Sequence, residues 1–208
     1  MGERGNGGVG EGSSVSHSPI LPLSHSSPDP CPLPDLVREG LEILFVGINP
    51  GLKSARVGHY YAGPGNLFWR CLHESGLTPV RLAPDEDRRV LEWGIGITDC
   101  VPRPTRSAGD VAGDEFRAAA PILLAKVERL RPRIVCFNGL TGARACFDPL
   151  AQPGPQGAPL GPARVFVVPS TSTANAGFTR EERVAWFVRL RELRDALRGL
   201  PSTPRLRR

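Results

Sequence analysis

The sequence predicts an α/β fold, a three-layer sandwich in which helices cover both faces of a central parallel four-stranded sheet. Two observations predict it. Short apolar runs bounded by turn residues recur along the chain, as buried parallel strands require. Longer stretches with apolar residues at helical spacing lie between them, and this alternation is typical of such sheets. The length of 208 residues suits one domain.

The first apolar run, residues 43–46, predicts a buried strand that Gly47 and the Pro50-Gly51 turn bring to an end. Asn49 is therefore expected at the carboxyl end of this strand. Ligands bind at that edge in open α/β sheets. The alternative is that the Asn49 side chain only caps the turn.

The loop at residues 53–65 carries Tyr60 and Tyr61 among several glycines, and we do not expect these aromatic side chains in the core. Asn66 fits an N-cap for a helix over residues 67–75, which Gly76 ends. After a polar stretch at 84–90, a second strand over residues 94–98 places Asp99 at its end.

The remaining elements alternate in the same way. We expect a loop at 101–113, a helix at 114–130, a strand at 133–137, a short helix to residue 147, a Pro/Gly-rich surface insertion at 148–163 and a strand at 164–168. Pro121 predicts that the helix at 114–130 begins late or kinks. A loop of small hydroxyl residues at 170–177 follows, and Thr179 with Glu182 forms a capping box for a last helix at 180–198.

The folded domain is expected to span residues 37–199. Residues 1–36 are rich in Gly, Ser and Pro and predict a disordered tail, while residues 200–208 predict a basic frayed tail. No run is long enough to cross a membrane or to form the core of a signal peptide. We therefore expect a cytoplasmic, intracellular protein without membrane contact.

The charge favours a polyanionic partner, because the net charge is +5 and the pI is ≈ 9.3. The five cysteines form no Cys-x-x-Cys pair, and the four histidines are scattered. This spacing disfavours a zinc site or an iron–sulfur cluster, so no metal and no cofactor are expected. Cys100 and Cys136 lie in apolar runs and should be buried thiols.

The predicted carboxyl edge of the sheet collects an amide, an aromatic loop, one carboxylate and a hydroxyl-rich loop. No phosphate-binding glycine motif and no nucleophile elbow follow any strand. A pocket of this kind suits a planar, hydrogen-bonding ligand such as a nucleobase. Stacking of a base on an aromatic side chain contributes about 1–3 kcal/mol.

The segments GINPGLKSARVGHYYAGPGNLFW, GIGITDCVPRPT, FNG and VPSTSTANAGF resemble the mismatch-specific uracil/thymine-DNA glycosylase branch of the uracil-DNA glycosylase superfamily. The resemblance extends from about Leu33 to Leu197. It implies hydrolysis of the N-glycosidic bond of a flipped uracil, or of another damaged pyrimidine, which leaves an abasic site. The implied partner is double-stranded DNA with a G·U mismatch, and single-stranded DNA is a further candidate. We expect the protein to act as a monomer.

The resemblance also implies roles for individual residues. Asn49 would hold the attacking water and Tyr61 would stack on the base. The backbone near Ile48 and Gly51 would bond the pyrimidine edge, and Ser54 would contact the base. The loop that enters the duplex as the base leaves it would consist of Ser170, Thr171, Ser172, Thr173 and Ala174.

Chemistry limits these roles in two ways. A neutral amide takes up no proton, so Asn49 can only orient the water and contribute electrostatically, effects that increase the rate by ~10²–10³. A lyase step needs an amine nucleophile, and Lys53 and Lys126 are the only lysines of the chain. Lys53 fits a phosphate contact or an exposed loop residue better, so a monofunctional glycosylase is expected.

Two departures from the family bear on mechanism. Asp99 stands where relatives carry an amide or a lysine, and we hypothesise that it is a second catalytic group, a general base for the water. The alternative is that Asp99 merely fixes the loop that follows. Where relatives carry a large wedge residue, this chain offers small side chains at 172–175, which predicts weak discrimination of the opposite base and action on single strands. The rival function is a non-catalytic nucleic-acid-binding module with the same fold.

Overall fold

Five strands form the central sheet of the protein, in the order β2-β1-β3-β5-β4. The computed structural model describes residues 31–199. Its elements are β1 (Ile43–Gly47), α1 (Leu52–Val57), α2 (Phe68–Glu74), the 3₁₀ helix η1 (Pro84–Trp93), β2 (Ile95–Asp99), the 3₁₀ helix η2 (Ala108–Asp110), α3 (Gly113–Leu130), β3 (Ile134–Asn138), α4 (Leu140–Cys146), β4 (Gly154–Pro155), β5 (Arg164–Val168) and α5 (Arg180–Leu197). The first four strands of this order run parallel.

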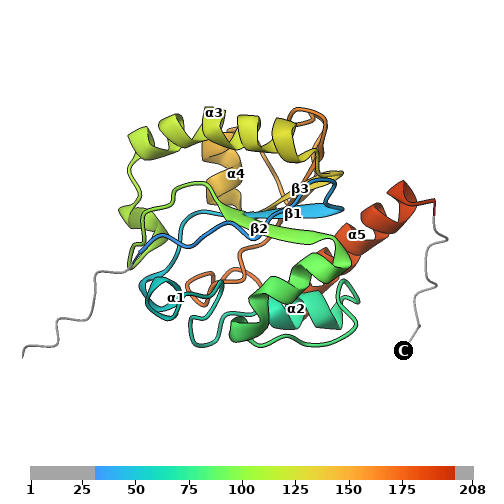
Figure 1. The fold of residues 1–208 in the computed structure, drawn as a ribbon, viewed down its shortest axis with the longest axis horizontal. Coiled ribbons are helices and arrows are strands. Elements are labelled where there is room, and N and C mark those ends of the chain that lie inside the picture. The colour runs from blue at the N-terminus through green and yellow to red at the C-terminus, as the bar shows by residue number, and fades with distance from the viewer. Residues whose placement is uncertain (1–30, 200–208) are drawn as a thin grey trace, which may run out of the picture.

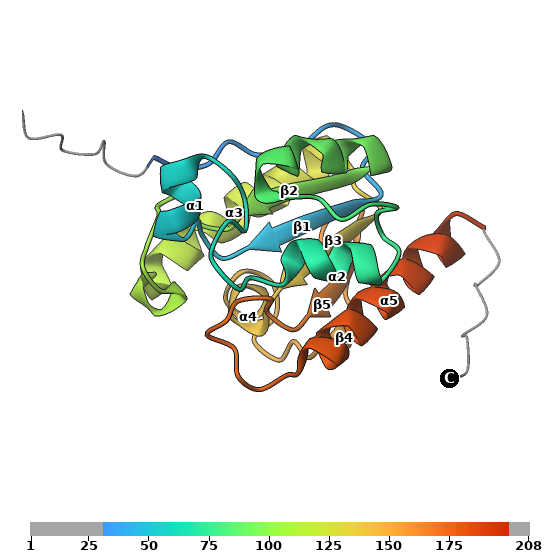
Figure 2. The ribbon, with the colours of Figure 1, turned by 90° about the horizontal axis from the view of Figure 1, so that it is seen from below.

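Helices cover both faces of the sheet, as predicted. Figure 1 shows α3 and α4 on one face and α2 and α5 on the other, and Figure 2 shows α2 and α5 lying over the sheet from below. Successive residues of β1 face opposite layers. Phe45 packs with residues of α2 and α5, and Leu44 with residues of α3. Both faces are apolar because both are buried, which confirms the three-layer sandwich.

Local hydrogen bonds explain where the helices begin. At α5 the Glu182 N–H donates to the Thr179 hydroxyl at 3.2 Å, and the Thr179 N–H donates to the Glu182 carboxylate at 2.7 Å. This is the predicted capping box. At α2 the Phe68 N–H donates to the Asn66 side chain at 3.0 Å. The helix thus begins one residue later than predicted, with Asn66 still bonding its first turn.

The predicted number of strands was too low by one. Within the Pro/Gly-rich segment 148–163, β4 pairs antiparallel with β5, with Gly154 opposite Val167 and Pro155 opposite Phe166. A proline cannot donate a hydrogen bond in the sheet, and it is tolerated here because β4 is the edge strand. Glycine and proline in so short a strand gave no strand signal in the sequence.

Four further local features differ from the expectations. The segment 52–57, most of it predicted as loop, forms helix α1, and the polar stretch 84–90 lies within the 3₁₀ helix η1. Helix α3 begins at Gly113, well before Pro121, so the late start that was one of the two alternatives is wrong. Tyr60 is buried in the core, with 4% of its surface exposed, although its loop was not expected to contribute to the core. Cys100 and Cys136 are buried, as predicted.

The domain packing begins before residue 37. Leu33 and Leu36 are buried, and the Leu36 N–H donates to the Ile97 carbonyl of β2 at 2.9 Å. The last residues of the predicted tail 1–36 therefore lie against the sheet. The rest of that tail, residues 1–30, and the predicted tail 200–208 are outside the described residues. No helix within residues 31–199 is long and apolar enough to cross a membrane.

Candidate active site

A cavity of about 670 Å³ opens at the carboxyl ends of the parallel strands. All of the site residues predicted from the sequence line it: Ile48, Asn49, Gly51, Ser54, Tyr61, Asp99, Ser170, Thr171, Ser172, Thr173 and Ala174. They come together because parallel strands end at the same edge of a sheet. β1 and β2 pair with Gly47 opposite Asp99, so the residues that follow these strands are neighbours.

The Asn49 side chain is fixed by the hydrogen bonds that its amide nitrogen donates. Nδ2 donates to the Thr105 hydroxyl at 2.7 Å, to the Arg103 carbonyl at 2.9 Å and, more weakly, to the Pro50 carbonyl at 3.3 Å. Both amide protons are therefore used by protein acceptors. Oδ1 accepts no hydrogen bond from residues 31–199, so it is the atom of Asn49 available to a ligand or a water.

Thr105 is a site residue that sequence reasoning missed. Its side chain is buried, and its hydroxyl donates to the Ser107 carbonyl at 2.6 Å while it accepts from Asn49. Its backbone pairs with the turn after β1, because the Thr105 N–H donates to the Pro50 carbonyl at 3.1 Å. The sequence signal was the RPT segment in the loop after Asp99, but nothing local indicated which residue it would contact.

Asp99 differs from Asn49 in the hydrogen bonding of its side chain. Its Oδ2 atom is buried without a hydrogen-bond partner in residues 31–199, and the side chain lies against Gly47, where an added Cβ would collide with Oδ1. Burial raises the pKa of Asp99 to about 7, the nearby Asp35 carboxylate adds to this effect, and Lys126 opposes it. No backbone N–H of the following loop donates to this carboxylate, which disfavours a purely loop-fixing role.

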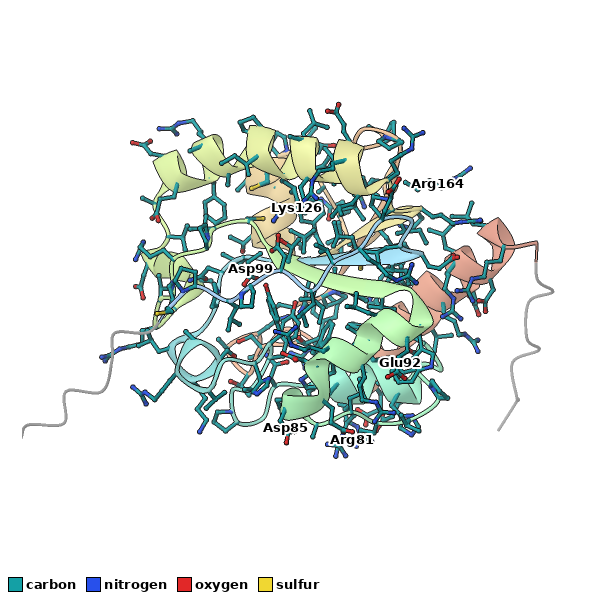
Figure 3. The ribbon with its side chains drawn as sticks, viewed as in Figure 1. Arg81, Asp85, Glu92, Asp99, Lys126 and Arg164 are labelled. Atoms are coloured by element: carbon teal, nitrogen blue, oxygen red, sulfur yellow. The ribbon has the colours of Figure 1, made fainter. Side chains whose placement is uncertain are left out.

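Lys126 and Asp35 form a charged pair behind Asp99. The Lys126 ammonium lies 2.6 Å from the Asp35 carboxylate and donates to the Thr98 hydroxyl at 2.6 Å. Figure 3 shows Lys126 between α3 and the sheet, near the end of β2 where Asp99 lies. The ammonium is committed to these partners, while the other lysine, Lys53, is exposed at the rim of the cavity.

One face of the Tyr61 ring is covered by a neighbouring side chain. Its ring stacks on Phe68 with centroids 3.9 Å apart, and its backbone adopts a left-handed conformation with φ of 53°. The Ala62 N–H donates to the Ser54 hydroxyl at 3.0 Å. Ser54 is itself buried, so its hydroxyl supports the tyrosine loop. Burial raises the pKa of Tyr61, whose hydroxyl lies beside Gly47.

The preceding tyrosine is fixed by two side chains. The Tyr60 N–H donates to the buried carboxylate of Asp87 at 3.0 Å, and the Trp69 indole donates to the Tyr60 carbonyl at 3.2 Å. Asp87 belongs to η1 and was not predicted as part of the site. These bonds hold the chain immediately before Tyr61, and they explain why Tyr60 is buried.

The hydroxyl-rich loop after β5 forms the opposite rim of the cavity. Thr171 is tied to β3 by two bonds: the Asn138 amide donates to its hydroxyl at 2.9 Å, and its N–H donates to the Asn138 side-chain oxygen at 3.1 Å. The Leu67 N–H donates to the Thr171 carbonyl at 3.0 Å. Thr173 lies so close to Gly65 that an added Cβ would be 2.7 Å from its methyl group. The two rims therefore touch.

The comparisons with known proteins agree with this geometry. The family model of the Uracil DNA glycosylase superfamily matches residues 34–193. The chain belongs to the uracil DNA glycosylase superfamily. Among solved structures, it is similar to a solution NMR structure of a candidate uracil DNA glycosylase from Methanosarcina acetivorans, with 24% identity and a TM-score of 0.56, over 79% of this chain and 98% of that one. This likeness shows the shared fold.

Membership of the superfamily identifies the domain as a DNA glycosylase, a hydrolase that acts on DNA. The cavity at the carboxyl edge is the part of this glycosylase that carries the family-like motifs. Residues 31–199 contain no group of three or more His, Cys, Asp and Glu side chains placed to hold a metal ion.

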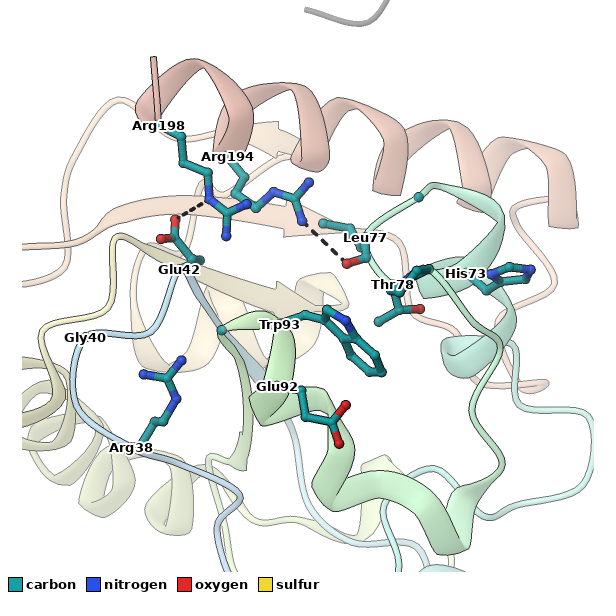
Figure 4. A pocket seen from close by; sticks show the side chains of 13 residues that line it. Arg38, Gly40, Glu42, His73, Leu77, Thr78, Glu92, Trp93, Arg194 and Arg198 are labelled. Atoms are coloured by element: carbon teal, nitrogen blue, oxygen red, sulfur yellow. Dashed lines mark hydrogen bonds and ion pairs between the residues drawn. The ribbon is translucent and has the colours of Figure 1, made fainter. Parts of the chain in front are cut away.

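A second cavity of about 710 Å³ lies at the other end of the sheet, close to Glu42 just before β1 and Gly94 just before β2. Two of its arginines have polar partners that also line the cavity. Arg198 lies 3.1 Å from the Glu42 carboxylate, and Arg194 donates to the Leu77 carbonyl at 3.4 Å (Figure 4). None of the predicted site residues lines this cavity, which separates it from the candidate active site of the glycosylase.

Proposed function

We propose that this glycosylase is a monofunctional, mismatch-specific uracil-DNA glycosylase that hydrolyses the N-glycosidic bond of a flipped uracil in DNA. The observation that carries the proposal is that Asn49 and Asp99 lie at neighbouring strand ends and line the same cavity. Among residues 31–199, the carbonyl oxygen of the fixed Asn49 amide accepts no hydrogen bond, and Oδ2 of the Asp99 carboxylate has no partner.

Asn49 would position the attacking water. Its Nδ2 is occupied by Thr105 and Arg103, so Oδ1 accepts a hydrogen bond from the water and points one lone pair of that water toward the sugar. The bonds are formed before substrate binds, and such a preorganised dipole costs no reorganisation during the reaction. A single group of this kind increases the rate by ~10²–10³.

Asp99 would accept the proton that the water loses as the new C–O bond forms. A base works best when its pKa lies near the operating pH, and the pKa of Asp99 is raised to about 7 by burial. As the bond between sugar and base breaks, its electron pair leaves with the uracil. Hydrogen bonds from the backbone near Ile48 and Gly51 would stabilise the resulting uracil anion.

Tyr61 would stack on the flipped base. One face of its ring is covered by Phe68, and the residue lines the cavity, so its other face is the candidate platform for the base. Stacking of this kind contributes about 1–3 kcal/mol. Ser54 would act through the loop that carries Tyr61, because its hydroxyl already accepts the Ala62 N–H.

Flipping supports a preference for mismatches. A mispaired uracil costs less to extrude than a paired one, and this difference alone provides selectivity for G·U. The loop 170–174 at the rim would enter the duplex beside the extruded nucleotide. The lysines support a reaction without a lyase step, because Lys126 is held in an ion pair with Asp35 at 2.6 Å and Lys53 is exposed on the rim.

The proposal is tested by alkali cleavage of labelled DNA carrying U·G, U·A, T·G or single-stranded U, with the wild type and Asn49→Ala. We expect product from the U·G duplex that is lost in Asn49→Ala, and no covalent trapping by borohydride. Binding of uracil-containing DNA without product from any substrate would contradict catalysis and favour the non-catalytic binding module. Strand cleavage without alkali would contradict the monofunctional reaction.

A further inference from the structure

Arg183 of α5 holds both ends of the loop at the rim of the cavity. Its side chain is buried, with 6% of the residue exposed. Nε donates to the Ser170 carbonyl at 3.0 Å, and Nη2 donates to the Asn175 carbonyl. One guanidinium thus joins the first and last residues of the segment 170–175, which sequence reasoning did not anticipate.

Within residues 31–199, no carboxylate forms an ion pair with Arg183. A second buried arginine on the same helix shows the usual arrangement. Arg194 lies 2.7 Å from the Asp195 carboxylate and also donates to the Leu77 carbonyl. Burial of a charge without a counter-ion is unfavourable. The hydrogen-bond acceptors of the Arg183 guanidinium are instead two backbone carbonyls of one loop.

We propose that Arg183 is a positioning residue that sets the shape of the 170–175 loop for entry into duplex DNA. The inference rests on the proposed function. The loop offers only small side chains at its tip, and Thr173 and Ala174 are exposed. A loop without a large wedge depends on its backbone shape, and preorganising that shape reduces the conformational cost of binding.

Bonds inside the loop fold its tip, with the Asn175 N–H donating to the Ser172 carbonyl at 3.1 Å, whereas Arg183 ties its second half to α5. Thr171 is fixed to Asn138, which anchors the first half. In the second half, the Asn175 amide donates to the Ser170 carbonyl at 3.1 Å, but the Asn175 carbonyl accepts its bond from Arg183. Without the guanidinium, residues 173–175 lose their hydrogen bond to α5.

Lysine is an informative replacement because it keeps the charge and loses the geometry. A guanidinium is a planar fork with several donors, while an ammonium is a compact point charge on a flexible stem. Arg183→Lys can reach one of the two carbonyls but cannot hold both in the same geometry. The matched control is Arg194→Lys, which makes the same change at a buried position of the same helix, outside the active-site cavity.

The first measurement compares single-turnover rates on U·G duplex and on single-stranded U, well below the melting temperature of each variant. We expect Arg183→Lys to lose about ten- to a hundredfold more rate on the duplex than on the single strand, the order of loss caused by a small displacement near a reacting group. Arg194→Lys should keep the wild-type ratio. Equal losses on both substrates, or no loss, would overturn the inference.

The second measurement is amide hydrogen exchange of the free protein over residues 170–177. Faster exchange in this segment for Arg183→Lys, and not for Arg194→Lys, is the expected result, and unchanged exchange would overturn the inference. This readout needs no activity. If the wild type cleaves no uracil substrate, the proposed function fails and the exchange data alone decide whether Arg183 holds the loop.

Discussion

Asn49 and Asp99 line the same cavity, but their side chains differ in how far their hydrogen bonds are satisfied. The amide nitrogen of Asn49 has three acceptors, while Oδ2 of Asp99 has no partner in residues 31–199. A buried carboxylate without donors is destabilising when ionised, and this is the physical cause of its raised pKa. The same feature that suits Asp99 to accept a proton therefore reduces the stability of the fold.

The stability of the protein should depend on pH through Asp99. Because its pKa is raised from 3.8 to about 7, the folded state holds a proton that the unfolded state has released between these values. Stability therefore falls as the pH rises through this range. We expect Asp99→Asn to be more stable than the wild type at pH 8, by on the order of a few kcal/mol, and to gain less at pH 4.5. Thermal unfolding checks this, and parallel pH dependences of the two proteins would contradict it.

The charges behind Asp99 should move the pH dependence of catalysis in opposite directions. Asp35 raises the pKa of Asp99 and Lys126 lowers it. We expect Asp35→Asn to shift the rising limb of the pH–rate profile to lower pH, and Lys126→Met to shift it to higher pH. Single-turnover rates between pH 5 and pH 9, an interval of about two units on either side of neutrality, measure both shifts. Shifts in the same direction would refute the coupling.

At the scale of elements, the loop that carries Tyr60 and Tyr61 is fixed by side chains of neighbouring helices. Asp87 of η1 accepts the Tyr60 N–H, Trp69 of α2 donates to the Tyr60 carbonyl, and Ser54 of α1 accepts the Ala62 N–H. These three elements hold both sides of Tyr61. The position of the aromatic platform is therefore a property of the surrounding helices.

Removal of the Asp87 carboxylate should disturb this loop. Asp87→Ala leaves the buried Tyr60 N–H without its acceptor, which costs about 1–3 kcal/mol. We expect lower stability in urea together with a weaker apparent affinity for uracil DNA, because Tyr61 loses its fixed position. Asp85→Ala is the control, since Asp85 is an exposed neighbour on the same helix. Similar effects of the two substitutions would contradict this role of Asp87.

The elements that the sequence predicted are those with a strong local pattern. The four parallel strands are buried apolar runs, and α5 has a capping box visible in its residue types. The elements that it missed depend on partners. β4 exists only because Gly154 and Pro155 lie beside β5. Similarly, Thr105 and Arg183 acquire their roles from residues far along the chain or on another element, which no local pattern encodes.

At the scale of the whole molecule, one rim of the cavity comes from the loop after β5 and the other from the tyrosine loop. Thr173 lies directly against Gly65, so the two rims meet at small residues. The net charge of +5 favours DNA as a partner in general. Neither feature supplies a bulky group to fill the space that a flipped base leaves in the duplex.

This surface predicts weak dependence on the opposite strand. We expect the rate on U opposite G to exceed the rate on single-stranded U by less than about a hundredfold, because the small loop makes few contacts with the orphaned guanine. Rates on U·G, U·A and single-stranded U, measured under single-turnover conditions, test this. A larger preference for the duplex would show that the loop reads the opposite base in spite of its small side chains.

The most direct test of the proposed mechanism is the single-turnover rate on a U·G duplex for the wild type, Asn49→Ala and Asp99→Ala. If one group orients the water and the other accepts its proton, both variants should lose about 10²-fold or more. The loss in Asp99→Ala should shrink below pH 7, where the wild-type carboxyl is protonated. Normal turnover by Asp99→Ala, with activity abolished in Asn49→Ala, would contradict the two-residue mechanism and leave Asn49 as the single catalytic group.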